Sequence, residues 1–332
     1  MRRPLCVLGL AVSAGLAADV EIRVSLNESH GSQISPLLDG CHFSTLNHQL
    51  FSLWVNMITD ESFEQVQNLD TNHPEYANNG WENLTEGDAN FMRSNNPNST
   101  AFNGLYFLRL QGGGDGTEGG IVNRGLYHQG FSLEGGKLYE GYLFARCRER
   151  STLTVSLEDE SLPRQGDVEE LSAQTLTCLG NGTWERLNFS MQPRRSTSCV
   201  GVQRGIEPPS CPTSPDEGAS CLLCGGSLVV RKGPGNSIVD LDQVYFAPGA
   251  WARYKPESES SKDAVEAVLA MGTKLLRFGG TFSWQPEYLW KTFRGQREER
   301  QPYLAYHDPK YGASRGYGKT HTPWYAYRHK TH

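Results

Sequence analysis

Alternating apolar and polar residues run through the middle of the chain and predict a series of short β-strands. Turns rich in Gly, Pro and Asp separate them, including a glycine-rich turn at residues 112–120. This pattern is typical of a β-sandwich or jelly roll. No helical pattern follows the glycine-rich turn, which argues against a phosphate-binding loop. The predicted strands are residues 104–111, 139–147, 153–157, 185–191, 227–231 and 238–246.

Before this strand region the pattern is mixed. Residues 20–26 alternate as in a half-buried strand, and residues 34–43 form a short extended run. Residues 70–100 are rich in Asn, Glu and Gly and are predicted to be loops. Residues 50–66 show helical spacing and are predicted to form an amphipathic helix. Its apolar stripe consists of Leu50, Leu53, Trp54, Met57 and Ile58.

After residue 248 the pattern changes to α/β. Ser261 is a plausible N-cap for a helix over residues 262–271, and Gly272 is placed to end it. Val265, Val268 and Leu269 are expected to face inward. An apolar strand at 274–278 follows and ends in two glycines. Helix, short link and buried strand suggest the start of a (β/α)₈ barrel.

Arg277 would lie at the C-terminal end of that strand, where barrel active sites form. If it is buried, it needs a carboxylate partner; the alternative is a solvent-exposed edge arginine. A complete barrel takes about 250 residues, and 84 residues follow Pro248. We therefore expect an incomplete barrel, with two or three of the eight strands.

The first 17 residues have the order of a secretory signal peptide. Two arginines precede an apolar stretch, and Gly15 and Ala17 fit the cleavage-site positions. A first buried helix or strand is the alternative. Five N-x-S/T triplets agree with secretion as candidate glycosylation sites. They begin at Asn27, Asn83, Asn98, Asn181 and Asn188.

Cysteine usage also indicates an oxidising compartment. The chain has 8 cysteines, and seven remain without Cys6 of the predicted signal. Four of them are crowded into a Pro-, Ser- and Gly-rich segment and are candidates for a disulfide-stapled loop: Cys199, Cys211, Cys221 and Cys224. A zinc site using Cys221 and Cys224 is the alternative, but a zinc ribbon needs a second close pair.

Charge is distributed unevenly along the chain. The formal net charge is −6, with −14 over residues 18–248 and +6 over residues 249–332. The acidic stretch makes nucleic acid or an anionic membrane an unfavourable partner. Residues 302–332 form a basic, aromatic tail with no assigned role. No run of about 20 apolar residues occurs beyond the N-terminus.

Three segments, in this order, resemble the α-L-arabinofuranosidases of glycoside hydrolase family 51. The first runs from Ile34-Ser35-Pro36-Leu37-Leu38-Asp39-Gly40 to Ser62-Phe63-Glu64. The second is Val239–Pro248 with Trp251 and Arg253. The third is Leu276-Arg277-Phe278-Gly279-Gly280 with Tyr288, Trp290-Lys291, Gly295 and Glu299-Arg300.

The resemblance implies a carbohydrate-binding-like jelly roll inserted near the start of a catalytic barrel. It further implies retaining hydrolysis of terminal α-L-arabinofuranosyl groups from arabinan- or arabinoxylan-type polysaccharide by two glutamates. Both glutamates are expected beyond the end of this chain, so no catalytic residue is assigned within it. The acidic residues Glu287, Glu298 and Glu299 fit a solvated charge cluster better than a catalytic pair.

The resemblance implies that four positions of this chain support an active site or bind substrate: Ser44, Asn47, Arg277 and Thr281. Arg277 matches the arginine that steadies the nucleophile. Ser44 stands where the family has a sugar-contacting glutamate, Thr281 stands where many members have asparagine, and the proline before the two glycines is missing. These departures weaken the case for chemistry on this chain.

The alternative is a secreted carbohydrate-binding protein without catalysis. Such proteins stack aromatic rings on sugars, and Trp81, Tyr106, Tyr127 and Trp184 are candidates, although each fits a core position better. No cofactor is expected; a structural calcium at Asp240 and Asp242 is an option, with a cap or turn role the better reading for Asp242.

The sequence thus predicts a jelly roll inserted into an incomplete (β/α)₈ barrel. Arabinose-containing polysaccharide is the expected partner. The predicted segments are a signal peptide (1–17), a first barrel unit (18–69), the jelly roll (70–248), a partial barrel (249–301) and the tail (302–332).

Overall fold

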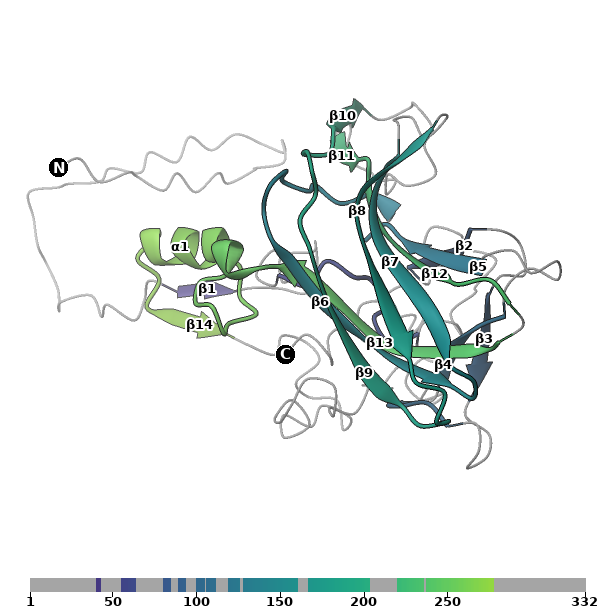
Figure 1. Cartoon of the computed structure of the whole chain (residues 1–332). Coiled ribbons are helices and arrows are strands. Elements are labelled where there is room, and N and C mark those ends of the chain that lie inside the picture. The colour runs from purple at the N-terminus through teal and green to yellow at the C-terminus, as the bar shows by residue number, and fades with distance from the viewer. Residues whose placement is uncertain are drawn as a thin grey trace, which may run out of the picture.

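Figure 1 shows a β-sandwich with a small α/β unit beside it. The computed structural model describes eleven stretches of the chain, and every structural statement below concerns these residues. They are residues 40–42, 55–63, 80–84, 89–93, 100–104, 106–111, 119–125, 128–160, 167–203, 220–235 and 237–277.

Two five-stranded antiparallel sheets pack face to face. Sheet one has the order β2-β5-β12-β7-β8, and sheet two has the order β3-β4-β13-β6-β9. The chain changes sheet between β6 and β7, between β8 and β9, and between β12 and β13, as in a jelly roll. The strands are β2 (Trp81–Asn83), β3 (Ala89–Arg93), β4 (Tyr106–Leu110), β5 (Gly119–Asn123), β6 (Tyr139–Cys147), β7 (Ser151–Glu160), β8 (Val168–Cys178), β9 (Glu185–Met191), β12 (Gly226–Lys232) and β13 (Val239–Pro248).

All six strands expected between residues 104 and 246 are present, as β4, β6, β7, β9, β12 and β13. The alternation that predicted them also fixes their faces. In β6, Leu143 and Ala145 belong to the core between the sheets, whereas Tyr142 and Phe144 lie on the opposite face. Period-two alternation thus identifies strands whose inner face is apolar.

Aromatic rings fill the centre of the core. Phe246 of β13 is fully buried, and its ring centroid lies 5.9 Å from that of Phe131 and 5.6 Å from that of Tyr139. Phe189 contributes a further ring at 6.4 Å from Phe246. Gly141 is required beneath Phe189, because a Cβ there would lie 2.3 Å from the end of that ring.

Four strands of the two sandwich sheets fall where no strand was expected. β2 and β3 occupy the stretch 70–100 that was predicted to be loops, and β5 begins inside the predicted turn at 112–120. β2 has only three residues, and β5 consists of Gly, Ile, Val and Asn. β8 is an edge strand whose polar residues are half-buried or exposed. Such strands form because neighbouring strands offer backbone partners, and their own pattern is weak.

The helix predicted over residues 50–66 is wrong for the part that the structure describes. Residues 55–63 form an irregular segment whose backbone bonds to β13: Met57 N donates to Phe246 O at 2.8 Å, and Val244 N donates to Glu61 O at 2.7 Å. Phe63 has a φ of 58°, outside the helical region. Of the predicted apolar stripe, the described residues are Ile58, which is buried, and Met57, which is half-buried. Backbone hydrogen bonds to β13 stand where intrahelical bonds were expected.

A β-bulge interrupts β13 where this segment meets it. The register between β13 and β6 shifts between Asp242 and Tyr245, and Gln243 has a φ of 50°. The extra residue resets the alternation, so Val244 and Phe246 face the core while Tyr245 and Ala247 face outward. The bulge therefore keeps both ends of a ten-residue strand correctly oriented.

The small α/β unit follows β13. Helix α1 (Lys262–Ala270) and strand β14 (Leu275–Arg277) occur close to their expected positions, and β14 pairs in parallel with β1 (Gly40–His42). Gly272, with a φ of 72°, follows the helix as expected. Ser261 occupies the N-cap without a side-chain hydrogen bond.

The inward orientation expected for Leu269 is wrong, because its side chain is 57% exposed and no residue of α1 is buried. Val265 and Val268, also expected to face inward, are half-buried, so the helix is covered only in part. One parallel strand pair and one helix are present here, and the described residues form no (β/α)₈ barrel. Among them, no helix is long and apolar enough to cross a membrane.

Candidate functional site

The outward face of sheet two carries aromatic and charged side chains where a solvent-facing sheet usually has small polar residues. We call this set the outer face. Alternation along β4, β6, β9 and β13 places its members there. They are Phe107, Arg109, Tyr142, Phe144, Arg146, Arg186, Asn188, Asp240, Asp242 and Tyr245, with Trp184 just before β9.

An ion-pair triplet lies at the centre of the outer face. Asp240 is directly opposite Arg109 on β4 and Arg146 on β6 in the strand register. Arg109 Nε donates to Asp240 Oδ1 at 2.7 Å, and Arg146 Nη2 donates to Oδ2 at 2.8 Å. The hydrogen bond to Asp240 raises the pKa of Arg109. Two cations thus share one carboxylate that is 7% exposed.

This triplet argues against the calcium option. Both oxygens of Asp240 accept hydrogen bonds from guanidinium groups, which would repel a divalent cation. Asp242 Oδ2 accepts from the backbone N of Asn103 at 3.1 Å, and its Oδ1 accepts from Gln243 N at 2.7 Å. Asp242 therefore stabilises the bulge and a crossing segment, close to the turn role expected for it.

Cation–π contacts connect the triplet to Trp184. The Arg146 guanidinium lies 5.1 Å from the ring centroid of Phe107 and 4.5 Å from that of Trp184. Phe107 and Trp184 meet edge to face at 6.1 Å. Each cation–π contact contributes about 0.5–2 kcal/mol. Arg146 is therefore held between two rings, and Trp184 has a defined orientation.

A second aromatic group lies farther along β6. Tyr142 stacks on Tyr245 with centroids 5.2 Å apart, and the Arg186 guanidinium lies 3.9 Å from the Tyr142 centroid. Arg186 Nε donates to Asn188 Oδ1 at 3.1 Å, and both side chains are exposed. Stacked rings beneath an arginine and an amide present hydrogen-bonding groups at a flat apolar surface.

The chain itself covers part of the outer face. Residues 100–104 cross it: Phe102 stacks on Phe144 with centroids 3.8 Å apart, and Thr100 O accepts from Trp184 Nε1 at 3.1 Å. Val55 packs on the Tyr142 and Tyr245 group. Tyr142 and Tyr245 are each 7% exposed, while Trp184 is half-buried. Trp184 and the Arg186–Asn188 pair are therefore the accessible part of the outer face.

Few of the residues singled out from the sequence meet at this face. Among the four aromatic candidates, only Trp184 is on it. Trp81 and Tyr106 are buried, at 3% and 6% exposure, and Tyr127 lies outside the described residues. Ser44, Asn47 and Thr281 also lie outside them, as does the side chain of Arg277, whose backbone pairs with His42.

Asp240 and Asp242 of the outer face were named only as a calcium option and Asn188 only as a glycosylation candidate, and the remaining outer-face residues were not predicted. A usable signal was present: in residues 139–147 and 238–246 the positions alternating with the core are aromatic or charged. Large rings on both faces of a strand indicate that both faces of the sheet are packed against other parts of the protein. The arginine partners of Asp240 depend on strand register, which the sequence pattern does not reveal.

The described residues contain two disulfides. Cys199 and Cys224 are bonded across the ribbon formed by β10 (Cys199–Gln203) and β11 (Ser220–Cys224), and both were candidates. The second bond joins Cys147 to Cys178, which the sequence analysis did not select. It connects the end of β6 in sheet two to the end of β8 in sheet one. Cys211 lies outside the described residues.

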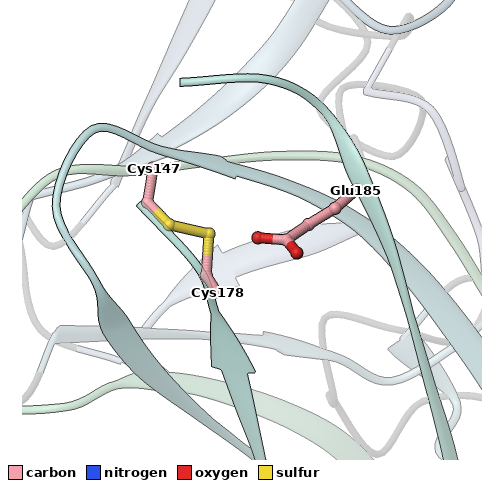
Figure 2. Close-up of side chains that lie close together, drawn as sticks. All are labelled: Cys147, Cys178 and Glu185. Carbon is pink, nitrogen blue, oxygen red and sulfur yellow. A yellow bond between two sulfur atoms is a disulfide. The ribbon is translucent and has the colours of Figure 1, made fainter. Parts of the chain in front are cut away.

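Figure 2 shows Glu185 close to this second disulfide. The two sulfur atoms and a Glu185 oxygen lie within 4.8 Å of one another, a spacing compatible with a metal ion. However, the sulfurs are bonded to each other and offer no thiolate. Glu185 Oε1 instead accepts from Leu179 N at 2.7 Å and closes the turn that follows β8.

Sheet one carries a cluster of charged side chains that links its strands. His128 Nδ1 lies 2.7 Å from Glu82 Oε1, and Arg124 contacts both Glu82 and Glu160. Hydrogen bonding to His128 is the main cause that lowers the pKa of Glu82 from 4.5 to about 2, aided by Arg124 and opposed by burial. The carboxylates are used in internal pairs, so the cluster connects β2, β5 and β7.

Comparisons with known proteins gave matches only at the level of structure. No protein-family model and no curated protein sequence matches this chain. A tailspike protein 4 domain of bacteriophage CBA120 aligns at a TM-score of 0.34 and 9% identity, over 58% of this chain and 21% of that one.

Two further matches are modules of a xylanase and of a glucanase. The CBM22-1-GH10 modules of Clostridium thermocellum xylanase 10B align at a TM-score of 0.33 and 12% identity, over 59% of this chain and 29% of that one. The N-terminal cellulose-binding domain of Cellulomonas fimi glucanase C gives 0.30 and 12%, over 51% and 89%. With TM-scores below 0.5, the assignment as a β-sandwich depends on the strand order described above.

Proposed function

We propose that the sandwich binds polysaccharide at the accessible part of the outer face, with Trp184 as the stacking ring. The observation that carries this proposal is a half-buried tryptophan held in one orientation at a sheet surface. Contacts to Arg146, Phe102 and Phe107 fix the ring. A ring that is already ordered loses little conformational entropy when a sugar stacks on it.

The polar groups beside the ring suit sugar hydroxyls. Arg186 and Asn188 are exposed on β9, the strand that begins directly after Trp184. Their guanidinium and amide groups supply several donors and one acceptor. Sugar sites combine an apolar surface with a few placed polar groups. A flat ring flanked by such groups favours an extended glycan over a compact cofactor.

Arabinose-containing polysaccharide is the proposed ligand class. Support comes from the sequence resemblance to family 51 arabinofuranosidases, which act on arabinan- and arabinoxylan-type chains. The predicted signal peptide and the two disulfides support an extracellular location, because disulfides persist in oxidising compartments. A secreted protein would meet such polysaccharides directly.

Replacing Trp184 with alanine is expected to weaken binding to arabinan or arabinoxylan at least about tenfold, equivalent to about 1.4 kcal/mol. Affinity gel electrophoresis of the whole chain measures this as lost retardation. Trp251→Ala is the matched control, because Trp251 is also half-buried but packs on Tyr139 at the core side. Equal retardation of wild type and Trp184→Ala would contradict the proposed site, and no retardation of wild type would contradict the function.

A catalytic relationship is the second candidate function. The resemblance suggests the N-terminal portion of a retaining α-L-arabinofuranosidase, and no residue of this chain matches either expected glutamate. We therefore expect purified 1–332 protein to release no 4-nitrophenol from the aryl α-L-arabinofuranoside. Turnover that persists through repeated purification would refute the assignment of no catalytic residue to this chain.

A further inference from the structure

Three of the five glycosylation triplets have an asparagine whose side chain the structure describes, and their surroundings differ. Asn83 is in β2, Asn181 lies in the turn between β8 and β9, and Asn188 is within β9. The triplet sequence alone treats the three as equal. The contacts of each side chain distinguish them.

Asn181 is the tip of an open turn. Residues 181–183 are all exposed, and a Cβ added to Gly182 would meet nothing within 4 Å. Thr183 donates to Asn181 Oδ1 from both its backbone N at 2.9 Å and its hydroxyl at 2.8 Å. In this local turn only the amide oxygen of Asn181 is engaged, and Nδ2 makes no hydrogen bond within the described residues.

The base of this turn is firmly held. The Cys147–Cys178 disulfide lies at the end of β8, and Gly182 N donates to Cys147 O at 2.8 Å. Glu185 Oε1 accepts from Leu179 N on the other side. A bulky group on Asn181 would therefore project from a rigid support into open space, with no folded contact to break.

Asn83 and Asn188 lack this freedom. Asn83 Nδ2 donates to Ala89 O at 3.2 Å, so a substituent would disturb the contact that joins β2 to β3. Asn188 is paired with Tyr142 within the sheet, and its Oδ1 holds Arg186. The middle residue of its triplet, Phe189, is 4% exposed in the core. A glycan on Asn188 would stand on the outer face itself.

We propose that Asn181 is an N-glycosylation site of this protein and that Asn83 and Asn188 remain unmodified. The donor is a lipid-diphosphate-linked oligosaccharide. A bond forms between Asn181 Nδ2 and sugar C1, the bond between C1 and the diphosphate oxygen breaks, and its electron pair leaves with the lipid diphosphate. The amide loses one proton to a base. The proposal rests on the extracellular location given under the proposed function.

Secretion of the full chain from a eukaryotic host, followed by glycopeptide mass spectrometry, tests this proposal. We expect a glycan on the Asn181 peptide and none on the Asn83 or Asn188 peptides. Enzymatic removal of N-glycans should shift the electrophoretic mobility of a variant lacking Asn27 and Asn98, and Asn181→Gln should abolish that shift. Thr183→Ala should abolish it too, whereas Thr183→Ser preserves the triplet and should retain it.

An unmodified Asn181 peptide in the secreted protein, or a glycan on Asn83 or Asn188, would overturn the proposal. Failure of the chain to enter the secretory route would overturn it as well. Neither result depends on polysaccharide binding, which is measured separately on protein that carries disulfides but no glycan. Failure of the binding assay and failure of glycosylation are therefore distinguishable.

Discussion

Replacing Asp240 with alanine is expected to lower the free energy of unfolding by about 3–5 kcal/mol, because removal of one partner leaves buried charge uncompensated. Asp240 is the one carboxylate between Arg109 and Arg146, whose side chains are 22% and 11% exposed. Without it, the two guanidinium groups on β4 and β6, the strands on either side of β13, would repel each other in a poorly solvated position. Urea unfolding of the full chain, followed by tryptophan fluorescence, measures the change.

Glu169→Ala is the matched control for this prediction. Glu169 also accepts hydrogen bonds from two arginines, Arg194 and Arg195, but it is at the surface. Exposed ion pairs contribute little to stability, so the unfolding midpoint of Glu169→Ala should stay close to that of wild type. Equal losses of unfolding free energy in the two variants would show that burial does not increase the contribution of the Asp240 triplet to stability.

Removing the Cys147–Cys178 disulfide by a double alanine substitution is expected to cost about 3–4 kcal/mol. The bond closes a loop with a sequence separation of 31 and joins the two sheets. Cross-linking stabilises the native state mainly by restricting the unfolded chain, and the effect grows slowly with loop length. Both residues are buried at 1% exposure or less, and alanine leaves no unpaired polar atom there.

Thermal unfolding with and without a thiol reductant measures this second effect. The double variant should unfold at a lower temperature than wild type in the absence of reductant. The Cys199→Ala, Cys224→Ala variant is the control, with a sequence separation of 25 in a separate ribbon. An unchanged midpoint in the Cys147→Ala, Cys178→Ala variant would show that the inter-sheet bond is not a major source of stability.

Local pattern was sufficient for much of the architecture. The six strands of the sandwich core, helix α1 and strand β14 were predicted because each has a regular period or a cap that depends on nearby residues. The prediction failed for residues 55–63, whose apolar spacing suits a helix. Their backbone groups bond to β13 instead, and a sheet partner more than 180 residues away leaves no trace in a local window.

The sequence by itself determined the β-sandwich class, the positions of its regular strands, and a region of disulfide-forming cysteines. Tertiary structure alone decided that Asp240 lies between two arginines, that Cys147 bonds to Cys178, and that Trp184 is the accessible ring. The physical reason is range: periodicity reports whether a side chain faces the core, whereas register and sheet order decide which side chain it meets.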